Sequence, residues 1–263
     1  MNLGGEQLPE SGKTPPRPEP VLRVRGMSVS FAGENGGLQA LQGVSFNLYP
    51  QEFVCLIGPS GSGKTTLLRA LAGLLRPTTG EVTYLGKTQP RVSLVFQDAN
   101  LMPWRSVLEN ITLPLELQGV PAEESRARGR DWIELVGLKG FEDAWPADLS
   151  GGMAQRVAIA RSLIQDPDLL LLDEPFGALD ALTREKMGAE LLNLWQTRRK
   201  TVLMVTHSIA EAILLSDRVL VLTPRPGRIE LDLPVDLPRP RQEEVRYTPH
   251  FGELARKLKR AIK

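Results

Sequence analysis

The sequence predicts an α/β fold whose core is a mostly parallel sheet, because short apolar runs alternate with helical patterns. Each run is nearly unbroken, as expected for a strand that is covered on both faces. The runs are Phe53–Ile57, Val92–Phe96, Leu169–Leu172 and Val202–Val205, with Arg218–Leu222 as a plausible fifth. The helical patterns between them include Thr65–Leu75 and Ala181–Trp195. Together these segments predict a layered sheet with helices on its faces.

The composition is that of an ordinary globular protein. The chain has 263 residues, 41% of them hydrophobic, and a net charge of +1. This near-neutral balance gives no electrostatic reason to expect a nucleic-acid partner, so we predict none. No stretch approaches the roughly 20 apolar residues that span a bilayer, and the polar start does not resemble a signal peptide. We therefore expect a soluble protein whose membrane role, if any, comes through a partner.

The single cysteine, Cys55, lies inside an apolar run. One cysteine cannot form an intrachain disulfide, which fits a reducing compartment. We predict that Cys55 is a small buried hydrophobe.

The chain divides into three segments. Residues 1–20 are rich in proline and predict a disordered tail. Residues 21–233 form the main domain, which opens with strands over Val21–Phe31 and Val44–Leu48 in an expected N-terminal antiparallel β subdomain, with a glycine-rich turn at 33–37. Residues 234–263 form a C-terminal extension. They begin with a proline-interrupted connector and end in a basic segment with apolar residues at helical spacing.

Two parts of this division have their own patterns. The stretch from about 98 to 165 lacks strand signals and predicts an inserted helical subdomain, with helices over Ala122–Val136 and Gly151–Gln165. In the extension, Phe251, Leu254, Leu258 and Ile262 fall at helical spacing. Such a basic helix either touches lipid headgroups or packs on the protein with a solvated basic face, and the second interpretation is favoured.

The strongest motif is a phosphate-binding loop. It follows an apolar strand, precedes a leucine-rich helix and matches G-x-x-x-x-G-K-[ST] in full. Its residues are Gly58, Pro59, Ser60, Gly61, Ser62, Gly63, Lys64 and Thr65, followed by Thr66. Glycines let backbone amides surround phosphate oxygens, and the helix directs its positive end at the same anion. Lys64 would reach the β- and γ-phosphates and Thr65 would ligate Mg²⁺, which makes the core a P-loop NTPase.

Two carboxylates, Asp173 and Glu174, end the apolar strand Leu169–Leu172. A parallel strand delivers such side chains to the edge of the sheet where ligands bind. We expect Asp173 to hold Mg²⁺, directly or through water, and Glu174 to act as the general base on the attacking water. Two solvated acids before the turn at Pro175 are the alternative.

Four further elements occur in an order that resembles ABC-type ATPases. Leu149–Met153 looks like the signature motif of that family, with Met153 where glutamine is most frequent. Gln97 ends a strand where the family has its Q-loop, and His207 ends the strand Val202–Val205 like the switch histidine. Residues 178–180, Ala-Leu-Asp, resemble the D-loop. The resemblance covers about Val21 to Arg228.

The resemblance implies a role for each matching residue. Lys64, Gln97, Glu174 and His207 would carry catalysis, with Thr65, Gln97 and Asp173 at Mg²⁺. Phe31 would stack on adenine, with a core aromatic as the alternative. The remaining residues would complete the site of a facing subunit: Ser150, Gly151, Gly152 and Asp180.

The same resemblance implies partners. Because each chain has one copy of each half-site, two chains would sandwich two ATP molecules as a homodimer. The segments Leu101–Asn110 and Thr223–Arg228 look like those of importer subunits for nitrate, bicarbonate and alkyl sulfonates such as taurine. In such importers a groove beside the Q-loop receives a helix of an integral membrane permease. We expect Met102, Trp104 and Glu109 to help line it, with a locally packed turn as an equal alternative.

The expected location is therefore peripheral, on the cytoplasmic face of the inner membrane. A periplasmic or extracellular substrate-binding protein would act only indirectly. A soluble nucleic-acid-linked ATPase and an exporter subunit remain as alternatives.

Overall fold

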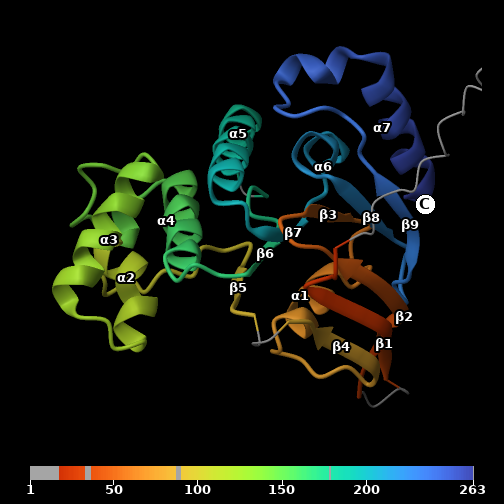
Figure 1. Ribbon diagram of the computed structural model, residues 1–263, viewed down its shortest axis with the longest axis horizontal. Helices are drawn as coiled ribbons and strands as arrows, with labels where there is room; N and C mark the ends of the chain where they lie inside the picture. Colours follow the sequence, from red (N-terminus) through yellow and green to blue (C-terminus); the bar gives the residue numbers. More distant parts are fainter. Residues whose placement is uncertain (1–17, 33–36, 87–89, 178, 263) are drawn as a thin grey trace, which may run out of the picture.

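The computed structural model describes residues 18–32, 37–86, 90–177 and 179–262, and it contains two sheets (Figure 1). Most of the expected tail, the turn at 33–36 and Ala178 lie outside these residues. The larger sheet has the order β5-β6-β7-β3-β8-β9, and the smaller one the order β2-β1-β4. The larger sheet is parallel from β5 to β8, and only β9 runs antiparallel. The predicted α/β architecture with an antiparallel N-terminal sheet is confirmed.

The bounds of the strands agree closely with the apolar runs. The larger sheet consists of β3 (Phe53–Ile57), β5 (Val92–Val95), β6 (Leu169–Asp173), β7 (Thr201–Val205), β8 (Arg218–Leu222) and β9 (Ile229–Pro234). The smaller sheet consists of β1 (Leu22–Phe31), β2 (Leu38–Leu48) and β4 (Thr79–Tyr84). The central strands β3, β6 and β7 are buried at every position, which explains why their sequences are unbroken apolar runs.

Each central strand faces two separate hydrophobic cores. In β3, Phe53, Cys55 and Ile57 pack with the helices, whereas Val54 and Leu56 pack with the smaller sheet. The helix α1 (Lys64–Leu71) lies between the two sheets, and its Leu67, Leu68 and Leu71 belong to the second core (Figure 1). This alternation is the two-residue period of a strand that is covered on both faces.

Three helices cover the face of the larger sheet that is opposite the smaller sheet. They are α5 (Ala181–Arg198), α6 (Ile209–Leu215) and α7 (Pro249–Ala261). A separate group forms the arm to one side of the sheets: α2 (Val107–Leu117), α3 (Ala122–Leu135) and α4 (Gly151–Leu163) (Figure 1). Short 3₁₀ helices occur at Pro146–Asp148 (η1) and Glu243–Tyr247 (η2). No helix within the described ranges is long and apolar enough to cross a bilayer.

Several sequence-based bounds need correction. The helix expected over Thr65–Leu75 ends at Leu71, because Gly73 adopts φ +73° and a left-handed residue cannot continue a helix. The second strand begins at Leu38 instead of Val44. Two strands and one helix were missed: β4 and β9, which are at most half-buried, and α6, which has only seven residues. Edge strands carry a weaker apolar signal than central ones, which accounts for the missed strands.

The C-terminal extension packs on the domain through α7. Phe251, Leu254 and Leu258 are buried, and α7 contacts α6. The basic side chains Arg256, Lys257, Lys259 and Arg260 are exposed. The apolar side of α7 is therefore covered by protein, and a surface helix with a solvated basic side is the arrangement in the structure.

One buried arginine joins this extension to α6. Arg241 is 6% exposed and donates hydrogen bonds to the carbonyls of Ile213 (2.8 Å) and Ser216 (2.5 Å) at the end of α6. It also donates to the carbonyls of Val235 and Leu237 (both 3.0 Å) in the connector. Burial lowers the pKa of the guanidinium to about 10, which leaves it charged at neutral pH. Arg241 thus satisfies helix-terminal carbonyls that have no partner within the helix.

We predict that Arg241→Leu lowers the free energy of unfolding by about 2–4 kcal/mol, because it leaves several buried carbonyls without donors. Thermal unfolding followed by circular dichroism should show a melting temperature about 5–10 °C lower. Arg260→Leu, on the exposed side of α7, serves as the control and should change little. Equal melting temperatures for the Arg241→Leu protein and the parent would contradict this role.

Candidate functional site

The phosphate-binding loop connects β3 to α1 and is shaped by close contacts with its neighbours. Gly63 adopts φ +95°, and a Cβ there would lie 2.7 Å from Leu41 Cδ2. A Cβ on Gly58 would lie 2.8 Å from the carbonyl of Leu222. Both positions therefore require glycine. The loop also turns back on itself, because the amide of Ser62 donates to the carbonyl of Pro59 at 3.2 Å.

Lys64 begins α1 and is 5% exposed. Its Nζ donates to the carbonyls of Gly58 (3.0 Å) and Pro59 (2.9 Å), so the ammonium is held over the loop. Burial lowers the pKa of Lys64, and the charges of Glu174 and Asp173 oppose that effect. A desolvated cation at a helix N-terminus is an arrangement that binds phosphate.

A cavity of about 410 Å³ opens above the loop. This cavity is lined by most of the residues that we expect to contact a nucleotide. They come from five different parts of the chain. They are Phe31, Ser60, Gly61, Gly63, Lys64, Thr65, Thr66, Gln97, Glu174 and His207, together with Leu38, Ala40 and Arg225. Gly58, Pro59, Ser62 and Asp173 are not part of this wall, and all of them except the half-buried Pro59 are buried beneath the surface.

Asp173 ends β6 and faces Thr65. It is 6% exposed, and burial raises its pKa, which a hydrogen bond from Thr65 partly offsets. Its Oδ1 has no hydrogen-bond partner among the described residues. A buried carboxylate oxygen without a donor beside a threonine hydroxyl fits Mg²⁺, which takes oxygen ligands and keeps phosphates and water in its shell. The described residues contain no cluster of three or more His, Cys, Asp or Glu side chains suited to a metal.

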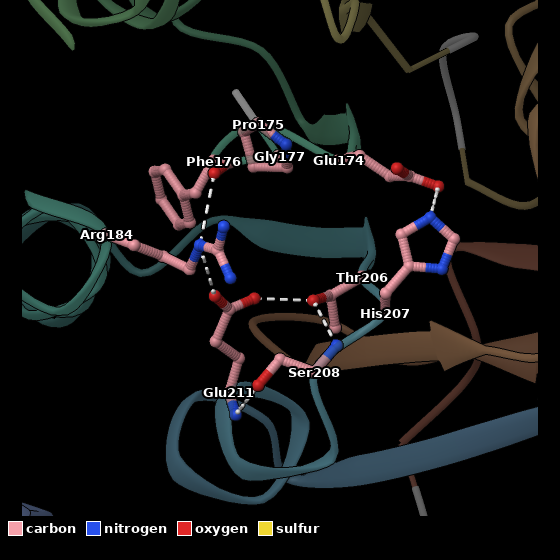
Figure 2. A pocket seen from close by; sticks show the side chains of 9 residues that line it. All are labelled: Glu174, Pro175, Phe176, Gly177, Arg184, Thr206, His207, Ser208 and Glu211. Atoms are coloured by element: carbon pink, nitrogen blue, oxygen red, sulfur yellow. Dashed lines mark hydrogen bonds and ion pairs between the residues drawn. The ribbon is translucent and has the colours of Figure 1, made fainter. Parts of the chain in front are cut away.

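Glu174 and His207 meet at the edge of the sheet, where β6 and β7 end. The carboxylate Oε1 of Glu174 lies 2.7 Å from Nε2 of His207 (Figure 2). Glu174 has φ +48°, an uncommon conformation for a residue with a side chain, and its amide donates to the carbonyl of Val205 at 3.1 Å. Strained backbone of this kind clusters at functional sites. The side chain of Glu174 is 14% exposed and that of His207 52% exposed, so the pair opens to the cavity on the histidine side.

Gln97 and Phe31 lie on other walls of the cavity. Gln97 is exposed just after β5, and its Nε2 would lie 3.5 Å from a Cβ built on Gly177, beside Glu174. Phe31 ends β1 and is 41% exposed. The alternative of a core aromatic at Phe31 is therefore wrong, because the ring is available at the surface of the cavity.

The signature residues form a different surface of the same chain. Ser150 caps α4 and accepts a hydrogen bond from the amide of Met153 at 3.3 Å. Asp180 caps α5 by accepting from the amides of Leu182 and Thr183 at 3.1 Å, and hydrogen bonds from Thr183 lower its pKa. A Cβ on Gly152 would lie 3.4 Å from Cγ2 of Thr183, so the two helix N-termini are neighbours. Ser150, Gly151, Gly152 and Asp180 do not line the cavity of their own chain.

Sequence reasoning missed one cation at the cavity. Arg225 lines it, is exposed, and donates from Nε to the carbonyl of Gly61 at 3.2 Å. Its loop is held against the phosphate loop by Gly227, whose amide donates to Ala40 and whose hypothetical Cβ would lie 2.1 Å from the carbonyl of Ser62. The arginines of this segment were visible in the sequence, but only the fold shows that Arg225 returns to the phosphate loop.

A second hollow lies on the helical arm. It encloses about 560 Å³ beside α2 and α3 and is lined by Trp104, Glu109 and the ion-paired Arg105 and Glu116. Trp104 is 69% exposed. Met102 does not line the hollow, contrary to expectation, and its backbone amide donates to Asn110 Oδ1 at 2.8 Å. Glu109 also closes a capping box at the start of α2 by accepting from the amide of Ser106.

Comparison with known proteins shows the family of the chain. The family model described as ABC transporter matches residues 41–177, more than half of the chain. An aliphatic sulfonates import ATP-binding protein of Streptomyces avermitilis is 49% identical, with 92% of this chain and 91% of the relative covered. A taurine import ATP-binding protein of Rhizobium johnstonii is 44% identical, with 91% and 95% covered.

Solved structures agree on the fold. The dimeric structure of a bacterial ABC transporter cassette superposes with a TM-score of 0.73 at 34% identity, and covers 82% of this chain and 99% of that one. A second dimeric structure of that cassette is described as a post-hydrolysis state bound to ADP and Pi. With the phosphate loop, the paired carboxylates and the capped signature helix in place, this chain belongs to the ABC transporter ATP-binding proteins.

Proposed function

We propose that this chain is the ATP-hydrolysing subunit of an ABC importer for a small anion of the alkyl sulfonate class. The observation that carries the proposal is the contact between Glu174 and His207 at 2.7 Å, on the wall of the cavity whose floor is the phosphate loop. Phosphoryl transfer needs charge neutralisation and an oriented water. Lys64 and the loop amides supply the neutralisation, and the contact between Glu174 and His207 lies where the water would attack.

Each residue has one task in this mechanism. Lys64 and the loop amides bind the β- and γ-phosphates. Glu174 accepts a proton from water while the water oxygen bonds to the γ-phosphorus and the bond to the β-phosphate oxygen breaks. His207 contacts the γ-phosphate and holds the Glu174 carboxylate, and Gln97 orients the water.

Mg²⁺ would be held by Thr65 and Asp173, with Gln97 nearby. When bound, it neutralises charge on the phosphate oxygens. The oxygen of Asp173 that lacks a donor supports this assignment.

A homodimer follows from the separation of the half-sites. Ser150 and Asp180 cap helices away from the cavity of their own chain, so we infer that they complete the cavity of a second copy. A γ-phosphate gripped by both chains binds the closed dimer better than the open one, and this difference drives closure. The dimeric cassettes among the similar structures support this arrangement.

Import of a sulfonate is supported by two of the similar proteins, which are named as ATP-binding proteins for the import of aliphatic sulfonates and of taurine. We infer that the hollow beside Trp104 and Glu109 receives a permease helix, which places the subunit at the cytoplasmic face of a membrane. Transport of taurine, nitrate and bicarbonate by the reconstituted permease complex would identify the cargo.

We predict that Glu174→Gln keeps ATP binding but lowers the rate of hydrolysis by about 10²–10⁴-fold, because the amide cannot accept the proton. Phosphate release measures the rate of hydrolysis. Size-exclusion chromatography with ATP tests whether ATP still binds, because a stable dimer should then accumulate. Lys64→Ala, which removes the phosphate contact, should instead lose ATP binding. Hydrolysis at the parent rate by the Glu174→Gln protein would show that the assigned base is wrong.

We also predict that Arg225→Ala weakens ATP binding by about 3- to 10-fold, because it removes a cation from the wall of the cavity. Titration with a fluorescent ATP analogue measures the Kd, and the difference should shrink at high salt. Arg228→Ala is the matched control, since Arg228 belongs to the same loop but pairs with Gln42 Oε1. Equal losses in the two variants would contradict a contact specific to Arg225.

A further inference from the structure

A third, smaller cavity lies behind the contact between Glu174 and His207. It encloses about 200 Å³ (Figure 2). Glu174 and His207 form one end of its wall, and Arg184 and Glu211 line it as well. The family comparison and the mechanism above assign no role to Arg184 or Glu211, although both are charged side chains that face this enclosed space.

Glu211 holds both neighbours of His207 in the sequence. Its Oε2 accepts a hydrogen bond from the hydroxyl of Thr206 at 2.5 Å, and that hydroxyl accepts from the amide of Ser208 at 3.0 Å. The amide of Glu211 in turn donates to the hydroxyl of Ser208 at 3.2 Å. The backbone on each side of His207 is therefore fixed by one residue in the first turn of α6.

Arg184 makes the corresponding contacts with the segment between Glu174 and Asp180. Its Nε donates to the carbonyl of Phe176 at 3.3 Å and its Nη2 to that of Leu179 at 2.9 Å. The same Nε lies 3.7 Å from Oε1 of Glu211, which has no hydrogen-bond partner among the described residues (Figure 2). The two side chains thus join the loop of His207 to the loop that carries Glu174 and Asp180.

The carboxylate of Glu211 is largely buried, and keeping a charge out of water costs free energy. The side chain of Glu211 is 13% exposed. Burial raises the pKa of its carboxyl, and the hydrogen bond from Thr206 and the charge of Arg184 oppose that effect. A carboxylate removed from water is retained where its partners are fixed in position.

We propose that Glu211 and Arg184 form a positioning pair for ATP hydrolysis, which sets His207 against Glu174 and links both to Asp180. This inference rests on the proposed function of the cavity. Because Asp180 would face the second chain, the pair also gives dimer association a direct path to the catalytic contact. The link runs through hydrogen bonds and one ion pair and needs no movement of the hydrophobic cores.

The pair can be tested with Glu211→Gln, which keeps an acceptor for Thr206 but removes the charge facing Arg184, and with Arg184→Lys, which keeps the charge but cannot reach both carbonyls. We expect either change to lower kcat by about 10- to 100-fold, because small errors in placing reacting groups cost that much. The Kd for ATP should change less than twofold by the same reasoning, since the phosphate loop is untouched. The kcat of the double variant should be no lower than that of the more impaired single variant, because the pair acts as a unit.

The matched control is Glu190→Gln, a charged residue further along α5. Glu190 accepts a hydrogen bond from Nη2 of Arg156 in α4 at 3.1 Å, and Arg156 also donates to the carbonyl of Val136. The Glu190→Gln protein should hydrolyse ATP like the parent. If Glu211→Gln and Arg184→Lys match this control in kcat, or if their effects simply add, the positioning role is wrong.

A spectroscopic measurement separates this inference from the proposed function. The chain has two histidines, His207 and His250, so the ring resonances of His207 can be assigned with a His250→Gln variant. In nucleotide-free protein, Glu211→Gln and Arg184→Lys should shift the His207 ring signals, and Glu190→Gln should leave them unchanged. Unmoved signals would overturn the pair even if ATP is hydrolysed. Shifted signals in a chain that does not hydrolyse ATP would instead contradict only the proposed function.

Discussion

The parallel pairing of β6 with β7 is the constraint on which the site depends. Asp173, at the end of β6, lies opposite Val205, at the end of β7. Glu174 and His207 follow these two strand ends, so both lie at the same edge of the sheet. The neighbouring β3 is parallel to β7 and delivers the phosphate loop to that edge as well. A shift of one residue in register would move each side chain of these strands from one hydrophobic core to the other, so the hydrophobic cores and the site are fixed together.

The same pairing explains which parts of the structure the sequence predicts well. The central strands are covered on both faces, so their apolar runs begin and end almost where the strands do. The phosphate loop is equally visible, because its glycines, Lys64 and Thr65 occur at a fixed spacing within eight consecutive residues. By contrast, β4 and β9 lie at sheet edges and are partly exposed, so they leave little trace in an apolar pattern.

Other features depend on contacts between distant segments and have no local signal. Arg225 reaches the phosphate loop only because Gly227 fits against Ser62 across more than 160 positions of sequence. A glutamate in the first turn of a short helix, such as Glu211, is ordinary in a sequence, and its hold on the loop of His207 becomes visible only with Arg184 beside it. Arg241 is similar, since an arginine after prolines gives no hint that its guanidinium will be buried under the end of α6.

The molecule therefore presents two incomplete surfaces: a cavity that binds the triphosphate and a pair of capped helix N-termini at Ser150 and Asp180. Our central claim is that the second surface closes the cavity of another copy. Because the only native cysteine, Cys55, is fully buried, introduced cysteines can report this directly. Chains carrying Ser60→Cys are mixed with chains carrying Ser150→Cys, both in the Glu174→Gln background, and are oxidised with and without ATP. The account predicts an ATP-dependent disulfide between the two kinds of chain. No such disulfide in the mixture, together with a bond that forms inside one chain carrying both cysteines, would contradict it.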